Sequence, residues 1–216
     1  MSYLAKLPLF SDLDPEQLQA LEKHTLLRSF PKNSVIITEG DISDSLYIIV
    51  SGHVRVFCSD EEGHEITLND LKAGDHFGEL ALFDDQQRSA SVITTEACRL
   101  LILNKNSLLD AFRACPDLAY QMFVHLAERV RALTNNVKSL ALMDVYGRVA
   151  NTLLELSETR DGQRVTRIPL TQQDIANRVG ASREMVSRIM KDLVIGGYIT
   201  VEKKKIVIND NLPARY

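Results

Sequence analysis

Residues 77–92 read FGELALFDDQQRSASV, and this stretch says more about the chain than any other. Gly78 and Glu79 open it, and Arg88 and Ser89 stand near its end, with a short polar turn between two apolar runs. Backbone N–H groups beside small residues and a guanidinium bind an anion, and a carboxylate accepts hydrogen bonds from sugar hydroxyls. The stretch therefore predicts a site for a phosphate joined to a ribose, rather than a surface turn with an ordinary salt bridge.

Short β-rich runs surround this stretch between residues 34 and 103. They are VIIT (35–38), LYIIV (46–50), HVRVF (53–57), EITLNDL (65–71), SASVITT (89–95) and CRLLIL (98–103). They alternate with Gly, Asp, Ser and Asn, a pattern typical of an antiparallel roll or barrel. We expect a short helix on either side, over 15–23 after the N-cap Asp14 and over 106–113.

A long helix is predicted to begin at Pro116. Its apolar positions alternate four and three residues apart, at Ala119, Phe123, Leu126, Val130, Leu133, Val137 and Leu140. Such a heptad seam is narrower than the stripe that a helix needs to pack on its own domain, so it favours a partner helix and hence a homodimer. Asp144 and Gly147 then mark a hinge before a second helix over 145–158.

The C-terminal part contains two short helices joined by a turn. Thr171 and Asp174 resemble a capping box at the start of the first helix, Gly180 ends it, and Ser182 caps the second. Two β-runs follow around Lys203, Lys204 and Lys205. This order predicts a winged helix-turn-helix, preceded by a turn at 159–164 (TRDGQR) and a short strand at 165–170 (VTRIPL).

Three charged residues, Arg183, Glu184 and Arg188, lie near the start of the second of these helices, away from its apolar face. An exposed Arg can bind guanine O6 and N7, and Glu can accept from cytosine N4–H. An exposed Arg–Glu pair is more often a solvated salt bridge. Here its place in a helix-turn-helix favours base recognition.

The composition fits a soluble globular protein of two modest domains, with 216 residues, 45% hydrophobic and 25% charged. Residues 1–143 hold 13 Lys and Arg against 20 Asp and Glu, whereas residues 144–216 hold 12 against 9. This asymmetry is typical of a DNA-binding domain joined to a sensor domain.

No apolar run would span a bilayer, and the N-terminus lacks a signal pattern. The three scattered cysteines indicate a reducing cytoplasm. No catalytic triad, carboxylate pair or metal-ligand spacing indicates an enzyme.

Residues 77–92 resemble the phosphate-binding cassette of cyclic-nucleotide-binding domains. Gly40, Gly52 and Gly74 stand where that family turns its β-roll, and tight turns favour glycine at positive φ. The resemblance implies that Glu79 holds the ribose 2′-OH. It also implies that the cyclic phosphate is held by Gly78, Leu80, Arg88 and Ser89.

Residues 182–188 (SREMVSR) resemble the recognition helix of the catabolite activator branch of the CRP/FNR transcription regulators, which reads TGTGA-type half-sites. The resemblance covers nearly the whole chain. It implies an α+β fold with a cyclic-nucleotide-binding antiparallel β-roll over 1–115, a dimerisation helix over 116–143 and a winged helix-turn-helix over 144–216. Double-stranded DNA and RNA polymerase are the implied partners, with DNA phosphate contacts from Gln172, Gln173, Ser182 and Lys191.

The match departs at the base-reading position of the long helix. In the catabolite activator branch, adjacent Thr and Ser residues contact the adenine base, and this chain has Leu133 and Thr134 there. Arg129, one turn earlier, stands where the family has an Arg facing the cassette Glu. Leu133 can neither donate nor accept a hydrogen bond, so a base N–H facing it would lose roughly 1–3 kcal/mol.

Three alternatives for the ligand stay open. Cyclic AMP binds and is read through Thr134 alone; another purine nucleotide such as cyclic GMP is preferred; or the chain responds to cyclic di-GMP or acts without ligand. A cyclic mononucleotide, with cyclic AMP first, is favoured because Glu79, Arg88 and Ser89 have little purpose otherwise.

Other sensor chemistries fit the residues less well. An iron–sulfur cluster needs clustered thiolates, whereas Cys58, Cys98 and Cys115 are dispersed. A haem needs a suitably placed histidine, and His76 and His125 are each more often packed or surface residues. A regulatory module that does not bind DNA would lack the winged C-terminal part. The sequence therefore predicts a cytoplasmic, homodimeric, ligand-responsive transcription regulator without metal, haem or cluster.

Overall fold

The computed structural model describes residues 13–160, 162–202 and 205–209, together with Leu4, Phe10 and Leu212. Its contacts divide the described chain into two compact units. The first holds the described residues up to Cys58 and Thr67–Arg131, and the second holds Ser59–Ile66 and the described residues from Ala132 onward. The boundary predicted at residue 143 remains a proposal, because the units meet in sequence within one continuous helix.

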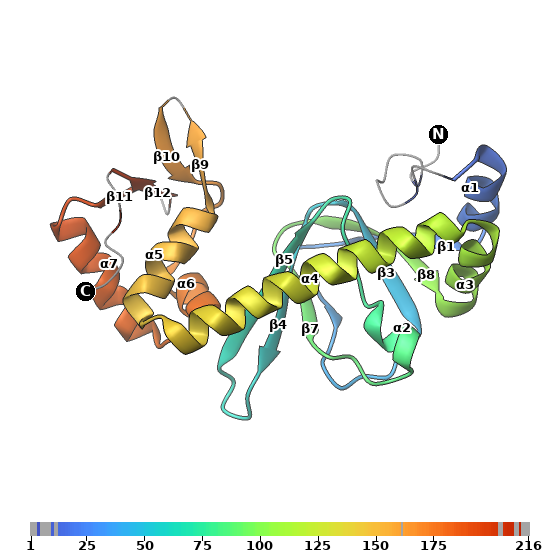
Figure 1. Ribbon diagram of the computed structural model, residues 1–216, viewed down its shortest axis with the longest axis horizontal. Coiled ribbons are helices and arrows are strands. Elements are labelled where there is room, and N and C mark those ends of the chain that lie inside the picture. The colour runs from blue at the N-terminus through green and yellow to red at the C-terminus, as the bar shows by residue number, and fades with distance from the viewer. Residues whose placement is uncertain are drawn as a thin grey trace. The chain divides into compact units, whose positions relative to one another are not determined.

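Two four-stranded antiparallel sheets form the predicted β-roll (Figure 1). One has the order β1-β8-β3-β6, from β1 (Thr25–Phe30), β3 (Ser45–Ser51), β6 (His76–Phe77) and β8 (Cys98–Asn104). The other has the order β2-β7-β4-β5, from β2 (Val35–Ile37), β4 (His53–Ser59), β5 (Glu65–Lys72) and β7 (Ser91–Thr94). The turn glycines Gly40, Gly52 and Gly74 all have positive φ, as predicted.

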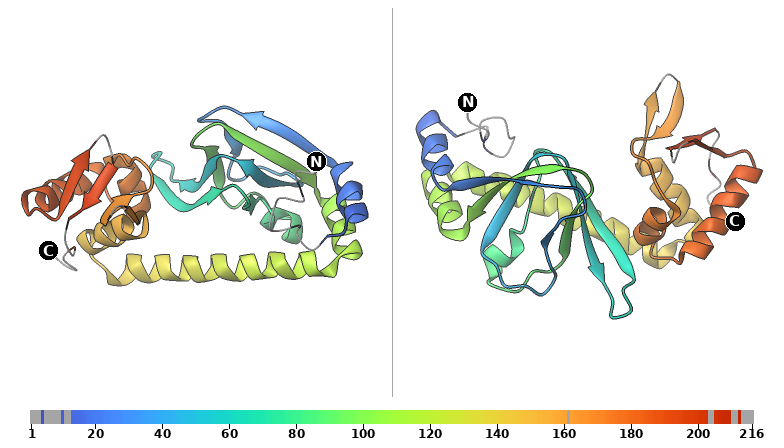
Figure 2. Two further views of the ribbon diagram at one scale, coloured as in Figure 1. Left: turned by 90° about the horizontal axis from the view of Figure 1, so that it is seen from above. Right: turned by 180° about the vertical axis from the view of Figure 1, so that it is seen from behind.

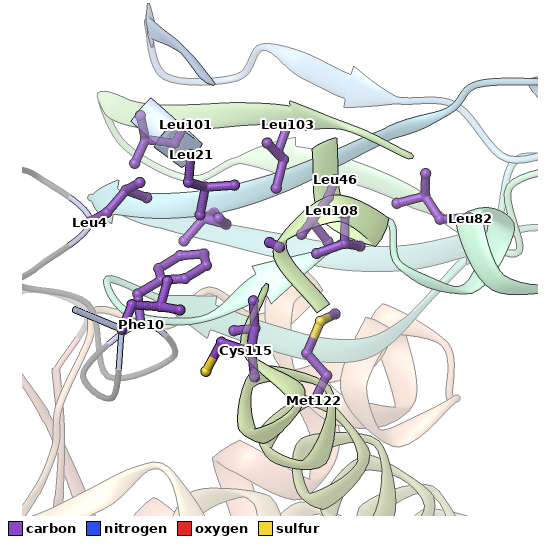
Figure 3. Packing of buried hydrophobic residues seen from close by; sticks show 14 residues of the cluster. Leu4, Phe10, Leu21, Leu46, Leu82, Leu101, Leu103, Leu108, Cys115 and Met122 are labelled. Carbon is purple, nitrogen blue, oxygen red and sulfur yellow. The ribbon is translucent and has the colours of Figure 1, made fainter. Parts of the chain in front are cut away.

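Apolar side chains from both sheets meet inside the roll. Ile49, Phe77 and Leu100 come from the first sheet, and Val54 and Val92 from the second. Each such side chain contributes about 1.5–3 kcal/mol when it is fully buried. A second cluster joins this roll to its helices (Figure 3), and its labelled members include Leu46, Leu82, Leu103, Leu108 and Met122.

Four helices accompany the roll: α1 (Pro15–Glu22), α2 (Leu80–Asp84), α3 (Lys105–Ala114) and α4 (Pro116–Leu142). α1 begins with a capping box, in which the Asp14 carboxylate accepts from the N–H of Gln17 and the Gln17 side chain accepts from the N–H of Asp14. α1, α3 and α4 confirm the predicted helices. Figure 2 shows α1, α3 and the start of α4 gathered at one end of the roll.

Two elements of the roll lie outside the sequence prediction. β1 pairs along its whole length with β8, although no strand was expected before residue 34. The stretch after Glu79 forms the short helix α2, and Asp85 follows it with a left-handed φ of 55°. The turn predicted at 84–87 thus begins with the last residue of α2, and residues 85–87 lie between α2 and β7.

The second unit is a winged helix-turn-helix. It contains α5 (Val145–Glu155), α6 (Gln172–Val179) and α7 (Arg183–Ile195), with a sheet of order β11-β12-β10-β9. Its strands are β9 (Ser157–Arg160), β10 (Gln163–Thr166), β11 (Ile199–Glu202) and β12 (Lys205–Ile208). Val149, Leu153, Ile175, Val186 and Leu193 lie in its core. Lys203 and Lys204, around which the wing was predicted, lie outside the described residues.

Helix α5 is shorter than predicted. It ends at Glu155, and residues 157–160 form β9, which pairs with β10. Part of the turn predicted at 159–164 thus belongs to β9 and β10, and Asp161 lies outside the described residues. The predicted strand begins two residues earlier than expected, at Gln163. Among the described residues, no helix is long and apolar enough to cross a membrane.

Candidate functional site

The predicted cassette is built around a buried arginine. Arg88 is only 4% exposed, because its guanidinium contacts the backbone of Gly78 and Ser45 instead of solvent. Nη1 donates to the carbonyl oxygen of Gly78 (2.5 Å), and Nη2 donates to the carbonyl oxygen of Ser45 (2.7 Å) and the hydroxyl of Ser43 (2.9 Å). Burial lowers the pKa of Arg88, and the nearby groups of Tyr47, Glu79, Asp44 and Asp41 act in the opposite direction.

Gly78 is required at its position for two reasons. Its φ is +87°, and a Cβ built on it would lie 2.7 Å from Nη1 of Arg88 and 3.0 Å from the carbonyl oxygen of Ser45. A side chain here would therefore push against the guanidinium that Gly78 itself holds through its carbonyl oxygen.

Glu79 and Arg129 form the ion pair that the resemblance implied. The carboxylate of Glu79 is buried, and Nη1 of Arg129 on α4 donates to its Oε1. Nη2 of Arg129 donates to the backbone oxygen of His76. The pair joins residues 50 positions apart, and it fixes this part of α4 over the cassette.

His76 lies beside the ion pair of Glu79 and Arg129, because its backbone oxygen accepts from Arg129. Its ring is buried at 1% exposure and stacks on the ring of His125, with centroids 5.4 Å apart. Burial, followed by the charges of Arg129 and His125, lowers the pKa of His76 to about 3. His76 is therefore neutral near pH 7.

Two complementary polar atoms in the cassette are left without partners. Oε2 of Glu79 and Nε of Arg88 are both buried and make no hydrogen bond within the described residues. One is an acceptor and the other a donor. A ribose hydroxyl is the donor that Glu79 lacks, and a phosphate oxygen is the acceptor that Arg88 lacks. The residues present therefore fit a sugar phosphate.

The remaining predicted ligand residues are more exposed. Leu80 begins α2 and is 46% exposed, and Ser89 is exposed beside Arg88. Leu133 and Thr134 lie on α4 one turn beyond Arg129, and Leu133 is 44% exposed. The structure thus brings together Gly78, Glu79, Arg88 and Arg129. The base-reading roles of Leu133 and Thr134 stay a prediction.

Two hydrogen-bond acceptors of the Arg88 guanidinium, on Ser43 and Ser45, were not predicted from the sequence. Both precede Arg88 by more than 40 residues, and no local pattern signals the contact. The carbonyl oxygen of His76 was also not predicted as an acceptor for Arg129, because a backbone atom carries no residue signature. Among the described residues, no group of three or more His, Cys, Asp or Glu side chains could hold a metal ion.

The heptad seam of α4 is exposed in the single chain. Phe123 and Val137 are 66% and 65% exposed, and Val130, Leu133 and Leu140 are also among the exposed large apolar residues. Leu118 and Met122, near the start of the same helix, are buried. A helix with one buried apolar face and a second exposed one has more apolar surface than its own domain covers.

Capping residues determine where the two helices of the helix-turn-helix begin and where the first one ends. Thr171 and Asp174 form the predicted capping box at the start of α6, and Gly180 ends α6 in a left-handed conformation. The hydroxyl of Ser182 accepts from the N–H of Met185 at the start of α7. Val186, at the buried face of α7, then fixes which side of the helix faces outward.

Most of the predicted DNA-contacting side chains are exposed, and Gln172 is half-buried. Arg183, Glu184, Arg188 and Lys191 are exposed on α7. Within the described part of the chain, Arg183 and Glu184 form no ion pair, so the salt bridge that competes with base recognition is absent. A hollow of about 570 Å³ adjoins Arg183, and it is lined by Leu170, Thr171, Gln172, Gln173, Arg183 and Val201.

Comparison with protein families gives two matches in the same order as the two units. Residues 27–115 match the cyclic nucleotide-binding domain, and residues 147–211 match the Crp-like helix-turn-helix domain. The first match contains the whole cassette, and the second contains α6, α7 and the wing strands.

Similar proteins match over nearly the full length. The chain is 36% identical over 213 residues to the CRP-like cAMP-activated global transcriptional regulator of Mycobacterium tuberculosis, covering 96% of this chain and 95% of that protein. It is 36% identical over 189 residues to the cAMP-activated global transcriptional regulator CRP of Escherichia coli, covering 86% and 90%. Among solved structures, the c-di-GMP responsive global regulator CLP of Xanthomonas campestris superposes with a TM-score of 0.81 at 26% identity, covering 91% and 100%.

Proposed function

The chain belongs to the CRP/FNR family of cyclic-nucleotide-binding, DNA-binding transcription regulators, and from this premise we propose that cyclic AMP is its ligand and that it acts as a homodimer. It is a regulator and not an enzyme. The proposed DNA target is a palindrome of TGTGA-type half-sites, the proposed further partner is RNA polymerase, and the proposed place of action is the cytoplasm.

The ligand proposal rests on two buried polar atoms, one on Glu79 and one on Arg88, that lack a hydrogen-bond partner within the described residues. The atom on Glu79 is an acceptor, and the atom on Arg88 is a donor. A buried unsatisfied group costs roughly 1–3 kcal/mol, so a ligand that supplies both a hydroxyl and an anionic oxygen gains from satisfying them. In this proposal Arg88, Ser89 and the backbone at Gly78 and Leu80 hold the cyclic phosphate, and Glu79 holds the ribose.

Charge favours a mononucleotide over a dinucleotide. The acidic groups that raise the pKa of the Arg88 guanidinium include the carboxylates of Glu79, Asp44 and Asp41. Arg129 is already paired with Glu79. A second phosphate close to Arg88 would therefore meet negative charge rather than a second cation.

Cyclic di-GMP is the second candidate ligand. The regulator from Xanthomonas campestris, whose structure resembles this chain, is responsive to c-di-GMP. Leu133 is apolar at the position where the catabolite activator branch reads adenine, which weakens the argument for that base. Direct competition between the ligands distinguishes the two candidates.

The exposed seam of α4 supports the homodimer. Apolar residues at heptad spacing, with Val130 and Val137 both more than 60% exposed, suit a second copy of the same helix. In a homodimer the two recognition helices would enter successive major grooves about 34 Å apart. Ligand shifts DNA binding only if it binds the DNA-competent arrangement more tightly than the other.

Calorimetric titration of the full chain with cyclic AMP, cyclic GMP and cyclic di-GMP tests the ligand proposal. We expect cyclic AMP to bind most tightly, and Arg88→Ala to abolish binding while leaving the circular dichroism spectrum unchanged. Arg28→Ala, at an exposed position on β1, is the matched control and should bind as the wild type does. Wild-type affinity in Arg88→Ala would refute the proposed pocket.

A further inference from the structure

Arg88 has few N–H groups left for a ligand. A guanidinium carries five N–H groups, one on Nε and two on each Nη. Both hydrogens of Nη2 are used, by the Ser43 hydroxyl at 2.9 Å and the Ser45 carbonyl oxygen at 2.7 Å. One hydrogen of Nη1 is used by the Gly78 carbonyl oxygen at 2.5 Å. Two N–H groups remain: that of Nε, which is buried and unpaired, and the second hydrogen of Nη1.

A phosphate that binds a guanidinium in bidentate fashion takes two parallel N–H groups on one edge. Nε and Nη2 share one edge, and Nη1 and Nη2 share the other. Both edges include Nη2. One of the two acceptors on Nη2 must therefore give way before Arg88 can bind a phosphate through two hydrogen bonds.

The two acceptors differ in how easily they can leave. The carbonyl oxygen of Ser45 belongs to the backbone of β3, where Ser45 pairs with Asn104 of β8. The hydroxyl of Ser43 stands in the loop before β3, at the end of a side chain with a single rotatable bond to the oxygen. Rotation about that bond between staggered positions releases Nη2 without moving the backbone.

We propose that Ser43 sets the affinity of this chain for its cyclic nucleotide, by holding the Nη2 of Arg88 that the phosphate needs. The inference rests on the proposed function, because it assumes that Arg88 binds a nucleotide phosphate. Ser43 is a positioning residue that acts through Arg88. Its hydroxyl keeps the guanidinium paired when no ligand is bound and gives way to the phosphate when one is.

Removal of the hydroxyl should therefore tighten binding. Ser43→Ala leaves Nη2 with one hydrogen free, and we expect the affinity for cyclic AMP to rise about ten- to a hundredfold, the equivalent of one hydrogen bond from a charged donor. Ser43→Thr keeps the hydroxyl and should bind as the wild type does. Ser43→Asp should pair with Arg88 permanently and weaken binding by more than tenfold.

Calorimetric titration of the full-length variants with cyclic AMP, cyclic GMP and cyclic di-GMP measures these affinities. Ser29→Ala, an exposed serine on β1, is the matched control. A gain in Ser43→Ala, with Ser43→Thr and Ser29→Ala unchanged, would support the role, because structural damage lowers affinity and does not raise it. Unchanged or weaker binding in Ser43→Ala, with Arg88→Ala still inactive, would overturn this role and leave the pocket standing. Absence of nucleotide binding in the wild type would overturn both.

Discussion

Gly78 offers the sharpest test of the cassette geometry, because another glycine of similar φ can serve as its control. Gly78→Ala adds a Cβ that would lie 2.7 Å from Nη1 of Arg88 and 3.0 Å from the carbonyl oxygen of Ser45. Gly63 has a similar φ of +81°, against +87° for Gly78, but a Cβ there would meet nothing within 4 Å. The loss of stability in Gly63→Ala therefore measures the cost of a positive φ alone.

The two variants should lose different amounts of stability. Positive φ costs a residue with a side chain about 1–2 kcal/mol, which is the expected loss for Gly63→Ala. Gly78→Ala should lose in addition the hydrogen bond between Arg88 and its own carbonyl oxygen, about 1.5–3 kcal/mol for a charged donor. Its total loss is then about 2.5–5 kcal/mol, and a displaced Arg88 should lower cyclic nucleotide affinity at least tenfold.

Urea unfolding followed by circular dichroism measures the stability difference, since the chain contains no tryptophan to report by fluorescence. Calorimetric titration with cyclic AMP at a temperature where both variants are folded measures the affinity. Equal destabilisation of the two variants, with nucleotide affinity unchanged in Gly78→Ala, would show that Gly78 does not hold Arg88 in the way described.

Three further predictions concern other parts of the chain. Because the folded pKa of His76 is lowered from 6.5 to about 3, the unfolded chain binds more protons between these values, so stability should fall as the pH drops from about 6.5 toward 3. Acid unfolding of His76→Phe should lack this loss, about 1.4 kcal/mol per pH unit. Val137→Glu should yield a folded monomer in sedimentation equilibrium, and a persistent dimer would exclude the α4 seam as the interface. Glu184→Ala should relax base preference at one half-site position, whereas Lys191→Ala should weaken all sequences alike, and a uniform loss in both would refute the assignment of the recognition helix.

The order of elements could be predicted from the sequence where local signals were strong. The capping residues Thr171 and Ser182 start α6 and α7 because a side-chain oxygen there satisfies an N–H that the helix cannot. The 3/4 spacing from Pro116 onward marked α4 for a similar reason, since periodicity is a property of consecutive residues.

Elements that depend on distant partners were missed. β1 (TLLRSF) has a mixed pattern of exposure and becomes a strand because β8 offers it an edge. Ser157 and Glu158 continue a helical pattern in sequence, but they join β9 because β10 pairs with them. In both cases tertiary pairing overrides a weak local preference.

The candidate site divides in the same way. Residue types within one short segment indicated Glu79 and Arg88, and family resemblance added Arg129, which the structure pairs with Glu79. Ser43 carried no signal, because its contact with Arg88 depends on how a loop lies beneath the cassette. The residues that tune the site were therefore visible only in three dimensions.

The central claim is that nucleotide binding at the cassette controls DNA binding by α7. Fluorescence anisotropy of a labelled TGTGA-N6-TCACA duplex, titrated with the full chain in the presence and absence of cyclic AMP at one fixed salt concentration, tests it most directly. We predict a large gain in affinity with cyclic AMP, and no gain in Arg88→Ala. Equal binding with and without cyclic AMP would contradict the claim that this nucleotide is the signal, and absence of binding in both conditions would contradict the proposed DNA target.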